Sequence, residues 1–222
     1  MFAVIFEVEP KPERFDDYLA LAAELRPELE GIEGFVANER FRSRERPGLV
    51  LSLSIWRDEK AVVRWRSRAR HHEAQSRGRA EIFADDHLRV GEVVADSGLA
   101  PDAALPQHRF DETEVGVAKY VTLTEFAAGL GVEAADLGTE VGPPRDAPGV
   151  VEQQSFVGIT DPKKRLLLVG CRDAVAARHW QPAPPATGRR QRMVRIIRDY
   201  GLRDRREAPQ YHPPVPAGAT LA

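Results

Sequence analysis

The sequence predicts an α+β fold made of two similar units, and two observations carry this prediction. Residues 34–65 overlay on residues 149–180 without a gap, at a spacing of 115 residues and with ten identical positions. Unrelated stretches of this length and ordinary composition match at about two positions. Within each copy, the residue pattern follows the order strand, helix, strand, strand, helix, strand. This is the ferredoxin-like order, an antiparallel sheet with both helices on one face.

Length and composition agree with two globular units and exclude several classes of protein. The 222 residues are 42% hydrophobic, which is sufficient for two cores, and the net charge of −2 provides no field for nucleic acid or an anionic membrane. Cys171 is the only cysteine, so neither an intrachain disulfide nor a cysteine-rich metal site is expected, and the six histidines show no zinc-binding spacing. No signal peptide and no apolar stretch of about 18 residues are present, so we expect a cytoplasmic protein.

The first unit, residues 1–98, begins with a strand that is apolar on both sides, which suits a strand covered on both faces. Pro27 interrupts the first helix or ends it early. Asp58 is a credible N-cap for one continuous second helix. The expected elements are a strand over 2–9, a helix from Pro12 to about Gly31, hairpin strands over 35–43 and 49–56, a helix from Asp58 to about Gly78, and a strand over 87–96.

The second unit, residues 115–202, repeats this order with a clipped second helix. Its last strand matches that of the first unit at an offset of 103, so the second copy has lost 12 residues. Prolines 182, 184 and 185 stop the helix after Trp180, because proline lacks the amide donor and clashes with the preceding turn. The expected elements are a strand over 117–126, a weak helix near 126–138, hairpin strands over 150–160 and 165–171, a helix from Asp173 through Trp180, and a strand over 192–201. Residues 99–114 form a linker and residues 203–222 an irregular tail.

The first unit also resembles a known family, the antibiotic biosynthesis monooxygenase (ABM) domain. The likeness covers most of residues 1–96 and is carried by the Glu-Gly-Phe entry to the hairpin, the Trp-x-Asp before the second helix, and a histidine in that helix. Members of this family pair two such sheets into a dimeric α+β barrel, with a pocket between each sheet and its helices. The resemblance implies that the two halves form this barrel within one chain.

The activities of the resembled family vary, so the fold alone does not select one. They include cofactor-independent oxygenation of phenolic or polyketide-derived molecules, quinol oxidation, haem degradation and isomerisation. The haem-degrading branch uses an asparagine on the first strand, which this chain lacks, and a longer Trp-to-His spacing. The resemblance implies a cofactor-independent monooxygenase that uses molecular oxygen on an aromatic, quinol or polyketide-like small molecule. The alternative is a non-catalytic small-molecule-binding or scaffold protein.

Helical geometry ranks the candidate site residues. At about 100° per residue, His72 lies within about 20° of Trp65, whereas His71 is displaced by roughly 120°. We therefore expect His72 to act as base or proton relay, because imidazole titrates near neutral pH, and Trp65 to wall the pocket. Asn38 and Arg40 alternate with Val36 on one face of the hairpin and are expected to hold an oxyanion. Further expected substrate contacts are His71, Gln75 and Arg79.

Each candidate also has a purely structural interpretation. Trp65 and His72 can close the core under the helix, and for Trp65 this is favoured because Trp180 occupies the same place in the other copy. Asn38 and Arg40 can lie on a solvated strand face. The arginines of residues 64–79 spread around their helix, which is typical of a solvated surface, and no stretch has the signature of an RNA-recognition motif. We expect no metal, no resident cofactor, a pocket in the first unit only, and, beyond the intrachain pairing, a possible homodimer.

Overall fold

The computed structural model of the protein describes residues 1–100, 103, 105–127, 137–180 and 188–211. Eight strands form one sheet within these residues. The strands are β1 (Phe2–Pro10), β2 (Phe35–Ser43), β3 (Val50–Trp56), β4 (Phe83–Asp96), β5 (Tyr120–Phe126), β6 (Val150–Gly158), β7 (Arg165–Cys171) and β8 (Arg189–Gly201). The helices are α1 (Phe15–Glu30), α2 (Glu59–Arg66), α3 (Ala69–Arg77), α4 (Leu137–Val141) and α5 (Ala174–His179), with short turns η1 (Pro12–Arg14) and η2 (Gly78–Ile82).

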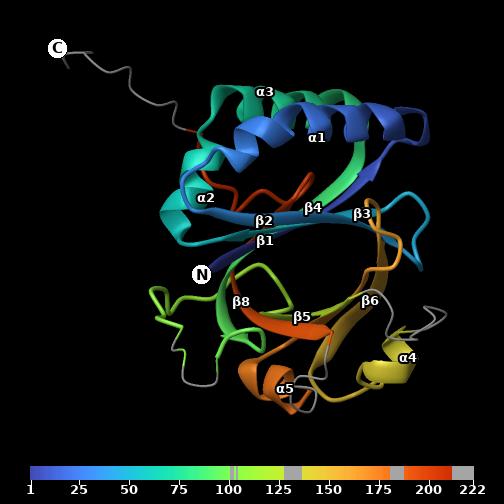
Figure 1. Ribbon diagram of the computed structural model, residues 1–222, viewed down its shortest axis with the longest axis vertical. Coiled ribbons are helices and arrows are strands. Elements are labelled where there is room, and N and C mark those ends of the chain that lie inside the picture. The colour runs from blue at the N-terminus through green and yellow to red at the C-terminus, as the bar shows by residue number, and fades with distance from the viewer. Residues whose placement is uncertain (101–102, 104, 128–136, 181–187, 212–222) are drawn as a thin grey trace.

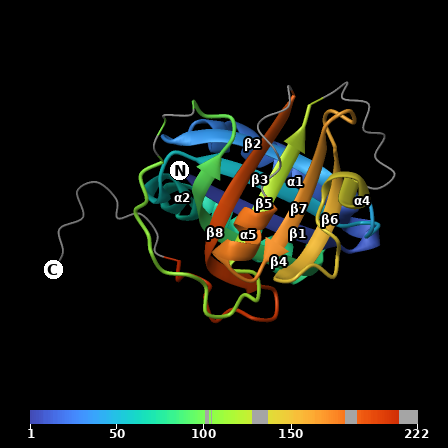
Figure 2. The ribbon, with the colours of Figure 1, turned by 90° about the horizontal axis from the view of Figure 1, so that it is seen from below.

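The sheet closes into an antiparallel barrel, in the order β1-β3-β2-β6-β7-β5-β8-β4. The first four strands are therefore arranged β4-β1-β3-β2 and the last four β8-β5-β7-β6, which is the same order twice. The halves join edge to edge, through β2 with β6 and β4 with β8. Helices α1, α2 and α3 cover the outer face of the first half, and α4 and α5 that of the second (Figures 1 and 2). The predicted α+β fold and its intrachain barrel are confirmed.

The apolar core of the barrel is built from the repeated positions. Alternate residues of a strand point to opposite faces, so one set faces the barrel axis and the other faces the helices. The inward set forms a single buried cluster to which both halves contribute. The repeat pairs in this cluster are Phe41/Phe156, Leu51/Leu166 and Leu53/Leu168.

A buried ion network also joins the two halves inside the barrel. The guanidinium of Arg89, which is 1% exposed, contacts the carboxylates of Glu7 and Glu152. His87 Nε2 lies 2.7 Å from Asp199 Oδ1. Burial opposes the ionisation of Glu7, but the charge of Arg89 and a hydrogen bond from His87 outweigh it and lower its pKa to about 2. Glu7, His87 and Arg89 come from the first half and Glu152 and Asp199 from the second, so the network ties the halves together.

Both halves cap their second helix in the same way. Asp58 Oδ1 accepts a hydrogen bond from the Ala61 amide at 2.8 Å, and Asp173 Oδ1 accepts one from the Ala176 amide at 2.8 Å. An aspartate at this position satisfies one of the free amides of the first turn, which stabilises a helix by about 1 kcal/mol. The two N-caps expected from the sequence are confirmed.

Two repeated glycines fit against these caps. Gly34 has φ of +91° and Gly149 has φ of +82°, a backbone region that favours glycine. A Cβ atom at either position would lie 2.7 Å or 2.5 Å from the Cβ of Ala61 or Ala176, respectively. The glycine and alanine identities of the repeat therefore reflect close packing of the hairpin entry against the helix start.

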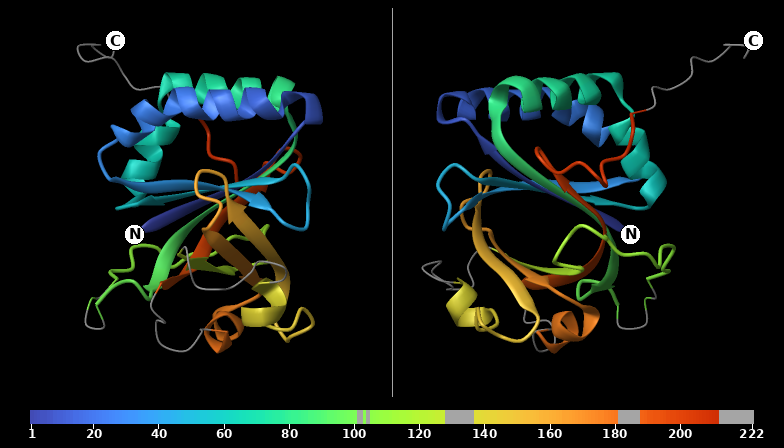
Figure 3. Two further views of the ribbon diagram at one scale, coloured as in Figure 1. Left: turned by 45° about the vertical axis from the view of Figure 1, so that its right-hand side comes forward. Right: turned by 180° about the vertical axis from the view of Figure 1, so that it is seen from behind.

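The second helix of the first half is not continuous, contrary to the expectation from the sequence. It divides into α2 and α3 at Ser67 and Arg68. Arg68 has an extended backbone (φ −67°, ψ 130°), and its amide donates to the Trp65 carbonyl at 3.1 Å in a tight turn. The chain therefore changes direction here, and α2 and α3 point along different axes (Figure 3). Helical phase cannot be carried from Trp65 to the histidines across this break.

The first helix and the C-terminal segment differ from the expectations based on the sequence. Helix α1 continues through Pro27 to Glu30, so the proline does not end it. Most of the weak helix expected near 126–138 and the prolines at 182, 184 and 185 lie outside the described residues. The C-terminal segment, residues 202–211, has neither helix nor strand and returns beneath α2 and α3 (Figure 3). The Glu207 carboxylate holds this segment by accepting hydrogen bonds from Thr113 Oγ1 and the Asp199 amide, both at 2.7 Å.

Candidate functional site

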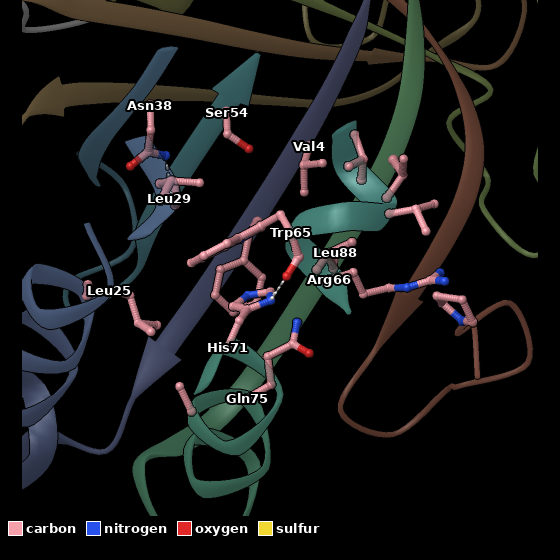
Figure 4. Close-up of a pocket in the computed structure, with 18 of the residues that line it drawn as sticks. Val4, Leu25, Leu29, Asn38, Ser54, Trp65, Arg66, His71, Gln75 and Leu88 are labelled. Carbon is pink, nitrogen blue, oxygen red and sulfur yellow. Dashed lines mark hydrogen bonds between the residues drawn. The ribbon is translucent and has the colours of Figure 1, made fainter. Parts of the chain in front are cut away.

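A cavity of about 190 Å³ lies between the outer face of the first half's sheet and its helices (Figure 4). We call it the chamber. An engineered apolar cavity of about 150 Å³ binds benzene, so the chamber has room for a somewhat larger apolar body. Its principal lining residues are Val4, Phe6, Asn38, Arg40, Ser52, Ser54, Leu88 and Val90 from the strands, and Tyr18, Leu25, Leu29, Trp65, Arg66, His71 and Gln75 from the helices.

His71 supplies the imidazole of the chamber. Its ring stacks on Trp65 with centroids 4.2 Å apart, and its Nδ1 lies 3.2 Å from the Trp65 carbonyl oxygen. Because a carbonyl can only accept, Nδ1 carries the proton and Nε2 holds the free lone pair. Burial lowers the pKa of His71 to about 4, against the raising effect of that hydrogen bond. The ring is therefore neutral at physiological pH and can accept a proton or a hydrogen bond.

His72 does not share a face with Trp65, so the prediction from helical phase is wrong. That prediction assumed one continuous helix, and the turn between α2 and α3 brings His71 under the tryptophan instead. The His72 ring stacks on Tyr211 with centroids 3.6 Å apart and lines a second cavity outside the chamber. The sequence favoured His72 over His71 as the pocket histidine, whereas in the structure His71 lines the chamber and His72 does not.

Asn38 lies on the chamber floor with its orientation fixed by the strands. Its Nδ2 donates to Ser52 Oγ at 3.0 Å and to the Leu53 carbonyl at 3.1 Å. Both amide hydrogens are therefore used, which leaves Oδ1 as an acceptor. Val36, expected on the same face, is instead 55% exposed beside a bulge between Phe35 and Ala37.

Arg40 brings a positive charge into the chamber. Its Nε is buried without a hydrogen-bond partner, and it forms no ion pair with any described residue. The guanidinium lies beside the hydroxyl of Tyr18, where burial raises the pKa of Tyr18 and the charge of Arg40 opposes that rise. Arg40 is half-buried and faces no counter-ion among the described residues, so an anion formed beside it in this chamber would be stabilised.

The remaining expected residues divide between the two cavities. Trp65 and Gln75 line the chamber, Gln75 also lines the second cavity, and Arg79 lines only the second cavity. The sequence reasoning missed Ser52 and Ser54, although their alternation with leucines in β3 marks polar positions on the face toward the helices. It also missed Pro209 and Tyr211, since no local pattern links the end of the chain to this site.

The second half has no comparable chamber. The cavity beside Trp180 measures about 10 Å³, against about 190 Å³ beside Trp65. The positions of the chamber serines are taken by Leu167 and Val169, which are buried in the core beneath α5. Beneath the helices, the larger cavity therefore lies in the first half, as expected. A further cavity of about 300 Å³ is lined mainly by second-half residues such as Phe126, Lys164 and Arg190, so the expectation of a pocket in the first unit only is wrong.

A closed α+β barrel with a cavity between its sheet and its helices defines a class of protein, and sequence comparison identifies the family within it. Residues 1–77 match the model of a family described as antibiotic biosynthesis monooxygenase (ABM). Over 226 residues the chain is 41% identical to "Jasmonate monooxygenase ABM" of Pyricularia oryzae, which covers 97% of this chain and 100% of that protein. The chain belongs to the ABM monooxygenase family, as its resemblance implied.

Solved structures of similar proteins include single-unit and longer chains. A putative monooxygenase from Lactobacillus acidophilus is 9% identical, with 89% of this chain and 94% of that chain covered and a TM-score of 0.39. An anthrone oxidase-like protein is 13% identical, with 94% and 96% covered and a TM-score of 0.38. An antibiotic biosynthesis monooxygenase is 22% identical over 43% of this chain and 100% of its own, with a TM-score of 0.39. None of the described helices is long and apolar enough to span a membrane.

Proposed function

We propose that this protein is a monooxygenase that uses molecular oxygen to oxidise a small amphipathic carboxylic acid of the jasmonate class in the chamber. The observation that carries the proposal is the chamber itself, which is largely apolar yet contains a neutral imidazole and an unpaired guanidinium. The relative named as a jasmonate monooxygenase, which matches nearly the whole chain, supports the substrate class. Jasmonate combines a cyclopentanone ring and a hydrocarbon side chain with one carboxylate, and its hydrocarbon part suits this lining.

The proposed chemistry requires no resident cofactor when the substrate has an acidic C–H bond beside a carbonyl or aromatic ring. His71 Nε2 accepts the proton, and Arg40 stabilises the anion that remains. Since both amide hydrogens of Asn38 are engaged, its Oδ1 can accept a hydrogen bond only from a substrate that carries a hydroxyl, such as a quinol. The anion donates its electrons to dioxygen and a C–O bond forms. The O–O bond then breaks with loss of water, so that CH2 and O2 become C=O and H2O, with all four electrons supplied by the substrate.

The direct test is product formation under ¹⁸O2. Jasmonic acid, an anthrone and a quinol form the substrate panel, so that the aromatic and quinol classes expected from the sequence are included. We expect oxygen uptake and a product carrying one ¹⁸O atom. Removal of a general base lowers the rate by about 10²- to 10⁴-fold, so His71→Ala should lower kcat within that range.

The matched control is His179→Ala in the second half. His179 lies against Trp180 with ring centroids 5.3 Å apart and lines neither the chamber nor the second cavity, so its loss should leave kcat unchanged. A larger loss in His72→Ala than in His71→Ala would overturn the assignment of the base. Tight ligand binding without turnover of any panel member would instead favour the non-catalytic binding protein.

A further inference from the structure

A second cavity of about 230 Å³ adjoins the chamber on the side of the C-terminal segment. We call it the vestibule. The two cavities are continuous in their walls, because seven residues line both of them. Arg66 lies at this junction and extends away from His71 toward the C-terminal segment (Figure 4). The shared residues are Phe6, Arg66, Gln75, Phe83, Leu88, Tyr200 and Pro209.

The vestibule concentrates positive charge. Arg66, Arg79 and Arg205 line it, and Asp86 is its only acidic lining residue. None of the three arginines forms an ion pair with a described residue, whereas most surface arginines of the first half, such as Arg57, do. If all four groups are ionised, the lining carries a net charge of +2, three positive charges against one negative.

The local contacts show that these charges are poorly compensated. Arg66 Nε is buried without a hydrogen-bond partner. Burial and the like charge of Arg205 both lower the pKa of Arg79, and Asp86 only partly opposes them. The neighbouring polar contacts of Arg79 and Arg205 are weak, at 3.5 Å to Ser76 Oγ and 3.3 Å to the Gly201 carbonyl. An anion between these side chains would relieve their mutual repulsion.

Contacts within the C-terminal segment, and between it and residues far away in the sequence, hold the wall of the vestibule in place. The ring of His72 on α3 stacks on that of Tyr211 at an interplanar angle of 10°. The Arg205 guanidinium lies 5.5 Å from the centroid of the Tyr200 ring. Glu207 anchors the same segment to the Glu114 amide at 2.6 Å. These contacts position the C-terminal segment and, with it, the exposed Arg205, which preorganises that side of the vestibule for a ligand.

We propose that the vestibule binds the carboxylate of the substrate while the apolar body of the same molecule occupies the chamber. The inference rests on the proposed function, since it assigns the two ends of an amphipathic acid to the two cavities. Guanidinium groups bind carboxylates through paired, charge-assisted hydrogen bonds, and Arg79 and Arg205 are the positioning groups. This arrangement fixes which end of the substrate reaches His71.

The test compares jasmonic acid with its methyl ester, which has the same apolar body without the charge. Binding is measured by calorimetry under argon, so that turnover does not contribute. We expect the wild type to bind the acid at least about tenfold more tightly than the ester. Arg79→Gln and Arg205→Gln should each weaken binding of the acid by about tenfold and leave the ester within about twofold. Arg79→Lys should recover part of the loss.

Arg70→Gln is the matched control, because Arg70 lies on α3 and is exposed but lines neither cavity. It should leave both affinities unchanged, and thermal unfolding verifies that all variants are folded. Equal affinity for acid and ester, or equal weakening of both by the glutamine variants, would overturn the proposal that the vestibule binds the carboxylate. Acid preference without oxygen uptake would support the vestibule and contradict the oxygenase. Oxygen uptake without acid preference would support the oxygenase and contradict carboxylate binding in the vestibule.

Discussion

The two halves of this molecule share a framework but differ in what they enclose. Each contributes four strands in the same order, an aspartate N-cap and a tightly packed glycine to one closed barrel. Outside the barrel they diverge. Helix α1 of the first half has 16 residues, and α2 and α3 continue the cover, whereas α5 has 6. Among the described residues, the space between helices and sheet is about 190 Å³ beside Trp65 in the first half and about 10 Å³ beside Trp180 in the second.

The difference between the two halves shows which positions must stay the same in both copies of the repeat. Repeated identities such as Leu51 and Asp58 serve the barrel interior and the helix start, which both halves need. Of the ten identical positions, only Trp65 lines the chamber. At the repeat spacing, Arg40 corresponds to Ser155 and Ser52 to Leu167. The shared barrel thus restrains one face of each sheet, while the other face is free to become a site in one half and a core in the other.

The largest effect is expected where the halves are tied together. Arg89→Met removes the cation between Glu7 and Glu152 and leaves two carboxylates in the barrel. Breaking a buried ion pair in this way lowers the free energy of unfolding by about 3–5 kcal/mol. Urea unfolding measures it, with the exposed Arg46→Met as the control expected to change stability by less than about 1 kcal/mol. Equal effects of the two substitutions would show that the network does not hold the halves together.

Exchanging one register position between the halves tests the contrast in their outer faces. Leu167, 2% exposed, packs beneath α5, so Leu167→Ser should destabilise the protein by about 3 kcal/mol. The opposite change, Ser52→Leu, places an apolar side chain in the chamber and should change stability by less than about 1.5 kcal/mol while abolishing binding of jasmonic acid. Unfolding curves and calorimetry measure both. Undiminished binding of jasmonic acid in Ser52→Leu would show that the ligand does not bind in the chamber.

The repeated glycines should respond alike, because their surroundings are the same. Gly34→Ala and Gly149→Ala each combine a positive φ with a Cβ contact below 3 Å, and each should lower the free energy of unfolding by about 2 kcal/mol. Gly48→Ala is the control, since Gly48 has φ of +89° but no atom within 4 Å of the added Cβ. It should cost about 1 kcal/mol from the backbone alone. A large difference between the two halves would contradict an equivalent structural role.

The smallest effects concern pH, and two histidines should act in opposite directions. The pKa of His71 is lowered to about 4 by burial, so its contribution to stability is present above about pH 6.5 and is lost as the pH falls through 4. Although burial opposes it, hydrogen bonds to Asp199 and Glu7 raise the pKa of His87 to about 9. Its contribution is present below about pH 6.5 and is lost as the pH rises through 9.

Melting temperature against pH separates these two contributions. In His87→Gln, the melting temperature should fall less steeply on the alkaline side. The corresponding change in the free energy of unfolding is about 1 kcal/mol or less, because the His87 side chain is 41% exposed and its charge is screened. His71→Gln should flatten only the acid side. An unchanged alkaline side in His87→Gln would mean that the pair with Asp199 does not stabilise the junction of the halves.

The elements and their order follow from local patterns in the sequence. Alternating residues identify the strands, Asp58 and Asp173 identify the helix starts, and the repeat shows that the same unit occurs twice. These features depend on neighbours along the chain, so a single sequence is sufficient to predict them. Asn38 and Arg40 were also placed on the hairpin face that lines the chamber, because strand alternation is regular there.

Long-range packing decided the details that matter for function. The turn at Ser67 and Arg68 interrupts a pattern that reads as one helix, and this break places His71 against Trp65. Glu7 of the Arg89 network contacts Gln154, 147 positions away, and the vestibule is lined by residues from both Phe6 and Tyr211. No local periodicity records such contacts, because their energy arises only when the barrel closes and the C-terminal segment returns beneath the helices.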